Sequence, residues 1–157
     1  MKKVLFLLMA IFAFGFQNVK AQDEPMSVST GNPDIKVKVL RCEASGDNVF
    51  IDMTITNKTG EDFEVFTVAK GNGCNTIVYD DNGNEFDSEK IRIRYGKDNF
   101  ESGHIYKNLI ADVPIKFSIL VTKVPQSTEY FSVVKPFMEN RDVPFKIVIK
   151  NLPITRD

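Results

Sequence analysis

Carboxylate and amide oxygens, the ligands that Ca²⁺ prefers, are concentrated between Asp80 and Asp87 in the stretch DDNGNEFD. An EF-hand loop beginning at Asp80 needs glycine at its sixth position and a bidentate glutamate at its twelfth. Glu85 and Ile91 occupy those positions, so the EF-hand pattern fails. Asn82-Gly83 instead predicts a type I′ β-hairpin turn, because both residues accept a positive φ. Weak Ca²⁺ binding at this turn stays open.

The single histidine, His104, offers the only imidazole for general acid–base chemistry. No Gly-x-Ser-x-Gly nucleophile elbow surrounds any serine, and a histidine metal site normally recruits more than one nitrogen or sulfur ligand. We therefore expect His104 to be a solvated loop residue, and we assign no catalytic residue, cofactor or metal. The chain is expected not to be an enzyme.

Two cysteines, Cys42 and Cys74, are separated too widely for a Cys-x-x-Cys redox or zinc motif. An even count in an exported chain is compatible with a structural disulfide. The strand alternation around Cys42, however, puts it on the same face as Lys36 and Lys38, which predicts an outward side chain. Cys74 falls in a glycine-rich loop. A Cys42–Cys74 bridge and two separate thiols are therefore both open.

Two further patterns suggest surface chemistry. The cations Lys90, Arg92, Arg94 and Lys97 fall largely on one side of a predicted strand and could hold a carboxylate or phosphate. A solvated outer face that discourages edge pairing is the favoured interpretation. Asn57-Lys58-Thr59 matches a glycosylation sequon, but it also coincides with a predicted turn.

Apolar residues recur with a period of two along much of the chain, which is typical of strands with one buried face. Ile51, Met53 and Ile55, for example, alternate with Asp52 and Thr54. Turn residues separate such segments, which predicts an all-β fold: an antiparallel, immunoglobulin-like β-sandwich of about 7–9 strands. The predicted strands cover residues 35–39, 49–55, 63–68, 76–79, 91–95, 115–121, 130–134 and 145–149.

The first 21 residues have the layout of a secretory signal peptide, with two lysines, a short apolar run and a Val-Lys-Ala cleavage signal. Residues 22–34 mix proline, serine, glycine and charge, and are expected to be a flexible leader. Residues 35–157 are expected to form a single domain. No later run approaches the ~20 apolar residues of a membrane-spanning helix. We expect a protein exported to the periplasm or the medium.

Charge argues against one class of partner. The whole chain has 20 basic and 21 acidic residues, and the expected signal peptide holds three lysines and no acid. The remaining chain has 17 basic and 21 acidic residues, a net charge near −4. Nucleic-acid binding needs a cationic surface, so no nucleic-acid partner is expected.

The order of strands and turns resembles a group of small exported domains of unknown function from bacteria of the Bacteroides type. The resemblance is carried by TITNKTGEDFEVF, TIVYDDNGNEFD, DVPIKFSILVTKVPQSTEYFSVVKPF and FKIVIKNLPI, with turns at Asn57, Gly83 and Val124-Pro125 and an aromatic pair at Tyr130-Phe131. It implies a telokin-like, immunoglobulin-like β-sandwich. It implies no activity.

A weaker resemblance is to the chagasin-like inhibitors of cysteine peptidases, which present three loops from an immunoglobulin-like sandwich. The matching loops here are Asn57-Lys58-Thr59-Gly60, Gly71-Asn72-Gly73 and Lys135-Pro136-Phe137. The tryptophan of the third family loop is missing, and the first loop lacks its proline. Such an inhibitor is the alternative to the function we expect.

The expected function is a non-enzymatic binding or envelope-associated module, with a protein or a glycan at the cell envelope as its unknown partner. Loops on a rigid scaffold commonly carry recognition, so the loops at one end of the sandwich are the candidate binding surface. The candidate residues are Asn57, Gly71, Gly73, Lys135, Pro136 and Phe137.

Overall fold

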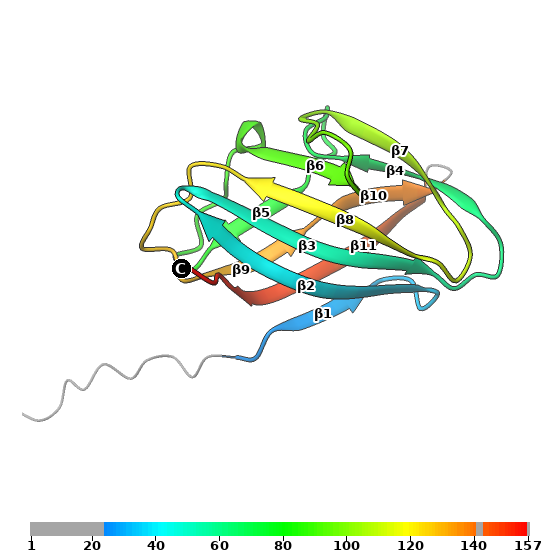
Figure 1. The fold of residues 1–157 in the computed structure, drawn as a ribbon, viewed down its shortest axis with the longest axis horizontal. Helices are drawn as coiled ribbons and strands as arrows, with labels where there is room; N and C mark the ends of the chain where they lie inside the picture. Colours follow the sequence, from blue (N-terminus) through cyan, green and yellow to red (C-terminus); the bar gives the residue numbers. More distant parts are fainter. Residues whose placement is uncertain (1–23, 141–142, 157) are drawn as a thin grey trace, which may run out of the picture.

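The computed structural model describes residues 24–140 and 143–156, so the expected signal peptide, residues 1–21, lies outside the described part. Eleven strands form two antiparallel sheets that pack against each other (Figure 1). One 3-10 helix, Ser88–Lys90, is also present. The expected all-β antiparallel sandwich is therefore confirmed, with more strands than the seven to nine predicted.

The smaller sheet has four strands and lies in front in Figure 1. Its order is β2-β3-β8-β6, so β2 and β6 form its edges. Consecutive β2 and β3 are joined by a tight turn at Gly46. The bounds are β2 Ile35–Ser45, β3 Asn48–Asn57, β8 Pro114–Val121 and β6 Ile91–Tyr95.

The larger sheet has seven strands in the order β5-β9-β11-β10-β4-β7, and β1 also pairs with β11. Strand β7 is its upper edge in Figure 1. Three of its strands, β1, β7 and β10, were not predicted. The bounds are β5 Ile77–Asp80, β9 Tyr130–Lys135, β11 Val143–Pro153, β10 Phe137–Asn140, β4 Phe63–Val68, β7 His104–Leu109 and β1 Ser27–Thr30.

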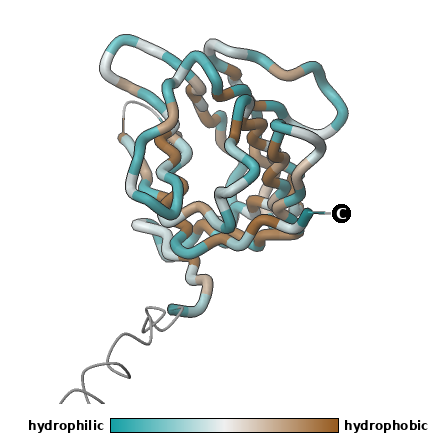
Figure 2. Tube along the Cα trace, turned by 90° about the vertical axis from the view of Figure 1, so that its left-hand side faces the viewer, coloured by the Kyte–Doolittle hydropathy of each residue, from teal (hydrophilic) through white to brown (hydrophobic). Residues whose placement is uncertain are grey.

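The core lies between the inner faces of the two sheets. Val49, Ile51, Met53 and Ile55, alternate residues of β3, are fully buried, as the period of two predicts. Apolar segments accordingly lie mainly along the strands and polar segments in the loops (Figure 2). Residues from the other sheet that join the same cluster include Val65, Val78, Phe131, Val134, Ile147 and Ile149.

The flexible leader expected for residues 22–34 is wrong for Ser27–Thr30, which forms β1. Val28 lies opposite Ile149 of β11, and the Gly31 N–H donates to the Lys146 carbonyl at 2.6 Å. A short strand without a long apolar run can be ordered in this way, because the neighbouring strand supplies its backbone hydrogen bonds.

A β-bulge corrects the predicted orientation of Cys42. The pairing of β2 with β3 shifts register between Val39 and Arg41, leaving Leu40 as the extra residue. One extra residue exchanges the two faces of a strand. Cys42 is therefore buried, 5% exposed, and Leu40 is 49% exposed.

The turn at Asn82-Gly83 is a hairpin turn, but it is not of type I′. Gly83 has φ +81°, whereas Asn82 is not among the residues with positive φ. The Gly83 N–H donates to the Asp80 carbonyl at 3.2 Å, and Tyr79 pairs with Glu85 across the turn. These contacts fit a type I turn followed by a left-handed glycine, which needs one positive φ and not two.

Asp52 is an ion buried on the outer face of the smaller sheet, and it is 1% exposed. Its carboxylate accepts hydrogen bonds from the Ser118 hydroxyl at 2.6 Å, Arg41 Nε at 2.6 Å and Lys116 Nζ at 2.9 Å. Burial opposes ionisation and would raise the pKa of Asp52, but these three donors outweigh it and lower the pKa to about 2. The cluster ties together β2, β3 and β8.

This pKa predicts a loss of stability in acid. Because the pKa of folded Asp52 is below its value in the unfolded chain, its contribution is present above pH ~4 and disappears as the pH falls toward 2. The wild-type protein should lose about 2 kcal/mol of unfolding free energy from this group, and Asp52→Asn should lack that loss. Urea unfolding between pH 6 and 2 measures the difference, with the exposed Asp47→Asn as control. Parallel pH profiles for all three proteins would contradict the assignment.

A second prediction tests the glycine turn. Gly83→Ala should destabilise the protein by about 1 kcal/mol, because an L residue resists the left-handed φ. Gly103→Ala is a matched control, since its φ is not left-handed and a Cβ there meets nothing within 4 Å. Thermal unfolding followed by circular dichroism compares the two. Equal stability of the Gly83→Ala and Gly103→Ala variants would contradict the turn assignment.

Candidate functional site

The three loops expected to form one binding surface lie at two different ends of the larger sheet. Asn57 precedes β4, whereas Gly71, Gly73 and the segment 135–137 lie where β4 ends. Six residues of extended strand separate these ends by about 17–20 Å. The turn before β4 is at the right-hand end of Figure 1. The predicted single cluster of loops is therefore wrong.

Asn57 is a buried turn-forming residue. Its side-chain amide donates to the carbonyls of Glu61 at 2.7 Å and Leu109 at 3.0 Å, and its Oδ1 accepts from the Thr59 N–H at 2.9 Å. The side chain is 0% exposed. These bonds occupy the nitrogen that glycosylation would modify, so the sequon is explained by the turn.

The other two candidate loops are neighbours, joined by the buried Thr76. Its hydroxyl donates to the Val68 carbonyl at 2.6 Å and accepts from the Phe137 N–H at 3.2 Å. Pro136 is buried, and Lys135 and Phe137 belong to strands β9 and β10, so this segment is a strand junction and not a projecting loop.

Gly71 and Gly73 are explained by the backbone of the loop between β4 and β5. A Cβ on Gly71 would lie 3.0 Å from Val68 Cγ1 and 3.1 Å from the Cys74 carbonyl oxygen. Gly73 has φ +80°, which favours glycine. Both glycines therefore have a structural reason that needs no ligand.

The acidic turn uses its oxygens internally. One carboxylate oxygen of Asp80 accepts from the N–H groups of Asn82 at 2.9 Å and Asn84 at 2.7 Å, and the other accepts from the Asn84 amide at 3.0 Å. Asp81 accepts from the Glu129 N–H at 2.7 Å. Among residues 24–140 and 143–156, no three His, Cys, Asp or Glu side chains are placed to hold a metal.

The four cations do not form one continuous row. Arg92 and Arg94 lie on β6, an edge strand, while Lys90 belongs to the 3-10 helix and Lys97 to the turn after β6. The Arg94 guanidinium lies 4.2 Å from the centroid of the Phe100 ring, a cation–π contact. Arg92 is exposed and Arg94 half-buried, and the edge of β6 is covered at Ile93, which exchanges backbone hydrogen bonds with Glu101 at 2.9 and 2.8 Å. The solvated outer face therefore remains a prediction for Arg92 alone.

His104 begins strand β7, so its expected placement in a loop is wrong. It is exposed and lies opposite Val68 of β4. Its ring centroid is 5.3 Å from that of Phe66 and 5.7 Å from that of Tyr106. The imidazole is therefore part of an aromatic cluster on the outer face of the larger sheet.

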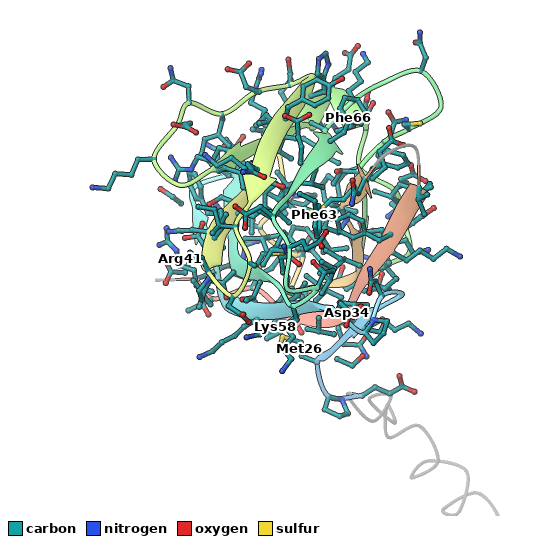
Figure 3. The ribbon with its side chains drawn as sticks, turned by 90° about the vertical axis from the view of Figure 1, so that its right-hand side faces the viewer. Met26, Asp34, Arg41, Lys58, Phe63 and Phe66 are labelled. Carbon is teal, nitrogen blue, oxygen red and sulfur yellow. The ribbon has the colours of Figure 1, made fainter. Side chains whose placement is uncertain are left out.

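This aromatic cluster borders a groove across β4, β7 and β10. Tyr106 and Glu139 lie on either side of Phe66 in the strand register, and the Phe66 and Tyr106 ring centroids are 5.0 Å apart. Figure 3 labels Phe63 and Phe66 along β4. The groove has a volume of about 510 Å³. We call it the aromatic–acidic groove; its lining is the aromatic residues Phe63, Phe66 and Tyr106, the acids Asp62, Glu64 and Glu139, and the amides of Asn108 and Asn140.

Sequence reasoning missed this groove because its residues come from three strands that are distant in the chain. Two of those strands, β7 and β10, were not predicted. A usable signal was the alternation of His104, Tyr106 and Asn108 with Ile105 and Leu109. That alternation places the three polar or aromatic side chains on one face of a strand.

Comparisons with known proteins are sparse. No family model matches the chain, and no curated protein matches it. A solved structure of a family 123 glycoside hydrolase from Clostridium perfringens is similar, with a TM-score of 0.41 and 10% identity. The match covers 85% of this chain but 27% of the hydrolase, and at this level it carries no inference about activity. Within the described residues, no helix has the length and apolar character needed to cross a membrane.

The two cysteines are separate thiols. Cys42 is buried in the core cluster, and burial raises the pKa of its thiol to about 12. Cys74 is half-buried in the loop between β4 and β5. Of the two arrangements left open by the sequence, the structure contains the unbridged one.

This difference predicts selective modification. A maleimide reagent should label Cys74 in the folded protein and reach Cys42 only on unfolding, because a buried thiol with a raised pKa is unreactive. Mass spectrometry after timed labelling measures the ratio, and Cys74→Ser should abolish the fast phase. Fast labelling of Cys42, or no free thiol without reductant, would contradict it.

Proposed function

We propose that this protein is an exported, non-enzymatic binding module of the cell envelope, and that its ligand surface is the aromatic–acidic groove. The observation that carries the proposal is the cross-strand row of Tyr106, Phe66 and Glu139 at the outer surface of the larger sheet. The row combines exposed aromatic surface with charged hydrogen-bond acceptors in one groove.

Exposure is the first reason for choosing this surface. Tyr106 is 59% exposed, although its ring is held by contacts with Phe66 and His104. Aromatic side chains held in this way offer large contact areas at little conformational cost, and they are frequent anchors of binding surfaces. The core beneath is already filled by buried residues, so these rings are not needed to complete it.

Polar groups are the second reason. Within the described residues, the carboxylates of Glu64 and Glu139 have no hydrogen-bond or ion-pair partner in the protein. They are therefore available to donors on a ligand. Aromatic faces with carboxylate and amide groups suit a polypeptide or a glycan, and the negative charge disfavours nucleic acid.

Export and a family relationship are parts of the proposal. Support for export is the signal-peptide layout of residues 1–21, and support for kinship with the telokin-like, immunoglobulin-like exported domains is the order of strands and turns. A non-enzymatic role is supported by the surroundings of His104: its ring packs beside Phe66 and Tyr106, and no serine, cysteine or threonine is among the described residues that line the hollow next to it.

The inhibitor alternative receives less support from the geometry. Chagasin-like inhibition would use loops that act together on one peptidase, but the Asn57 loop lies about 17–20 Å of strand away from the other two. Pro136 is buried and Asn57 is fully occupied by the turn. We therefore place the ligand on the sheet face.

The test is binding to arrays of envelope glycans and of peptides, using the processed protein. At least one array class should bind, and Tyr106→Ala should weaken that binding by about tenfold, roughly 1.4 kcal/mol. Leu40→Ala, which truncates an exposed side chain on the other sheet, should have no effect. Binding that is equal in both variants, or the absence of any binding, would refute the groove. Turnover of a hydrolase substrate by the wild type would refute the non-enzymatic role.

A further inference from the structure

Resting on the proposed groove, we propose that the ligand is an extended basic segment of a partner protein, which pairs with β7 as an added strand. Its main chain would bond to the open edge of the larger sheet. Its basic side chains would reach the carboxylates and rings on the outer face. Strand addition of this kind combines main-chain affinity with side-chain specificity.

The first support is the open edge of β7. In the described part of the chain, β4 is the only strand that pairs with it. The Ala69 N–H donates to the Gly103 carbonyl at 2.8 Å, so Ala69 and Gly103 form a hydrogen-bonded pair of the antiparallel ladder. Because antiparallel pairs alternate, the backbone N–H and C=O groups of His104, Tyr106 and Asn108 point away from β4.

The free backbone groups thus belong to residues whose side chains lie on the same outer face as the groove. Tyr106 and Asn108 line it directly. A segment hydrogen-bonded to this edge would lie beside the groove along its length. Every second side chain of that segment would point to the same face as Tyr106.

Charge is the second support. A further hollow of about 580 Å³ adjoins the start of β7 and is lined by residues that include His104, Ile105, Asp98 and Glu101. With Asp62, Glu64 and Glu139 in the groove, acids outnumber the nearby cations Lys97 and Lys107 along the strand. This excess favours a basic partner by charge complementarity, and the exposed rings offer cation–π contacts to lysine or arginine.

The same charges disfavour a second copy of this chain at the edge. Two β7 strands brought together would join two acidic outer faces, because Glu64 lies on the strand next to β7 in each copy. A glycan would contact the rings and carboxylates, but it cannot pair as a strand with the row of free backbone groups. A basic polypeptide satisfies the edge, the rings and the charge together.

The experiment uses the processed protein and a ten-residue peptide of alternating lysine and valine, with affinity measured by fluorescence anisotropy. Two further peptides carry N-methyl groups on alternate residues, one on the even and one on the odd positions. A strand added to β7 directs only half of its N–H groups to the edge. One methylated peptide should therefore keep its affinity, and the other should lose about tenfold or more.

Variants of the protein test the charge. Glu64→Gln should weaken binding of the unmodified peptide about fivefold, and more strongly at low salt, because screening reduces the contribution. Glu139→Gln should have a smaller effect, because β10 lies one strand further, about 5 Å, from the edge. Glu129→Gln, at an exposed loop near the other end of the sandwich, is the matched control. Amide resonances of β7 should shift on binding.

Several results would overturn the inference. Equal binding of both methylated peptides would mean that charge alone attracts the peptide to the protein, and it would reject the added strand. Binding of a glycan but not of the peptide, lost in Tyr106→Ala, would leave the groove as the binding surface and reject the added strand. Self-association through β7 in sedimentation experiments would make a second copy the occupant. If no glycan and no peptide bound the protein, the groove would also be rejected as a binding surface.

Discussion

The burial of two inner faces between the sheets is the interaction on which the rest of this structure depends. Since successive side chains of a strand point to opposite faces, each buried residue fixes the direction of its neighbours. Ile51 and Met53 face the core, so Asp52 must face outward. The bulge at Leu40 is the clearest demonstration: Leu40 keeps the outward direction of Lys36 and Lys38, and the one added residue turns Cys42 into the core.

The two outer faces are used differently. On the smaller sheet, Arg41, Lys116 and Ser118 close over Asp52, so the polar groups there neutralise one another and hold three strands together. On the larger sheet, Glu64 and Glu139 have no such partner among the described residues, and the Tyr106 ring near them is exposed while Phe66 is half-buried. Charge paired within the protein contributes to stability, whereas the carboxylates beside the aromatic surface are the ones on which the proposed binding rests.

Strand edges complete this contrast. Strand β5 is covered on its outer side, where the Phe86 N–H donates to the Val78 carbonyl at 2.8 Å. Strand β11 has β9 on one side, and β10 and β1 follow each other along the other. Strand β7 has no second strand neighbour in the described part of the chain. The aromatic surface and the free backbone groups therefore meet on one strand.

By itself, the sequence determined the fold class and eight of the strands, because burial on one face leaves a period of two that can be read locally, as in Val49 to Ile55. It also located the hairpin at Gly83 through its turn residues. The three remaining strands escaped because β1 and β10 are short and β7 has only Leu109 fully buried, which leaves little periodic signal. Only the tertiary structure decided the groove, since the pairing of Phe66 with Tyr106 and Glu139 depends on register between strands that are far apart in the chain. It also decided the separation of the three loops and the free state of the two thiols, because distances across a sandwich follow from how its sheets are connected and cannot be read from local spacing.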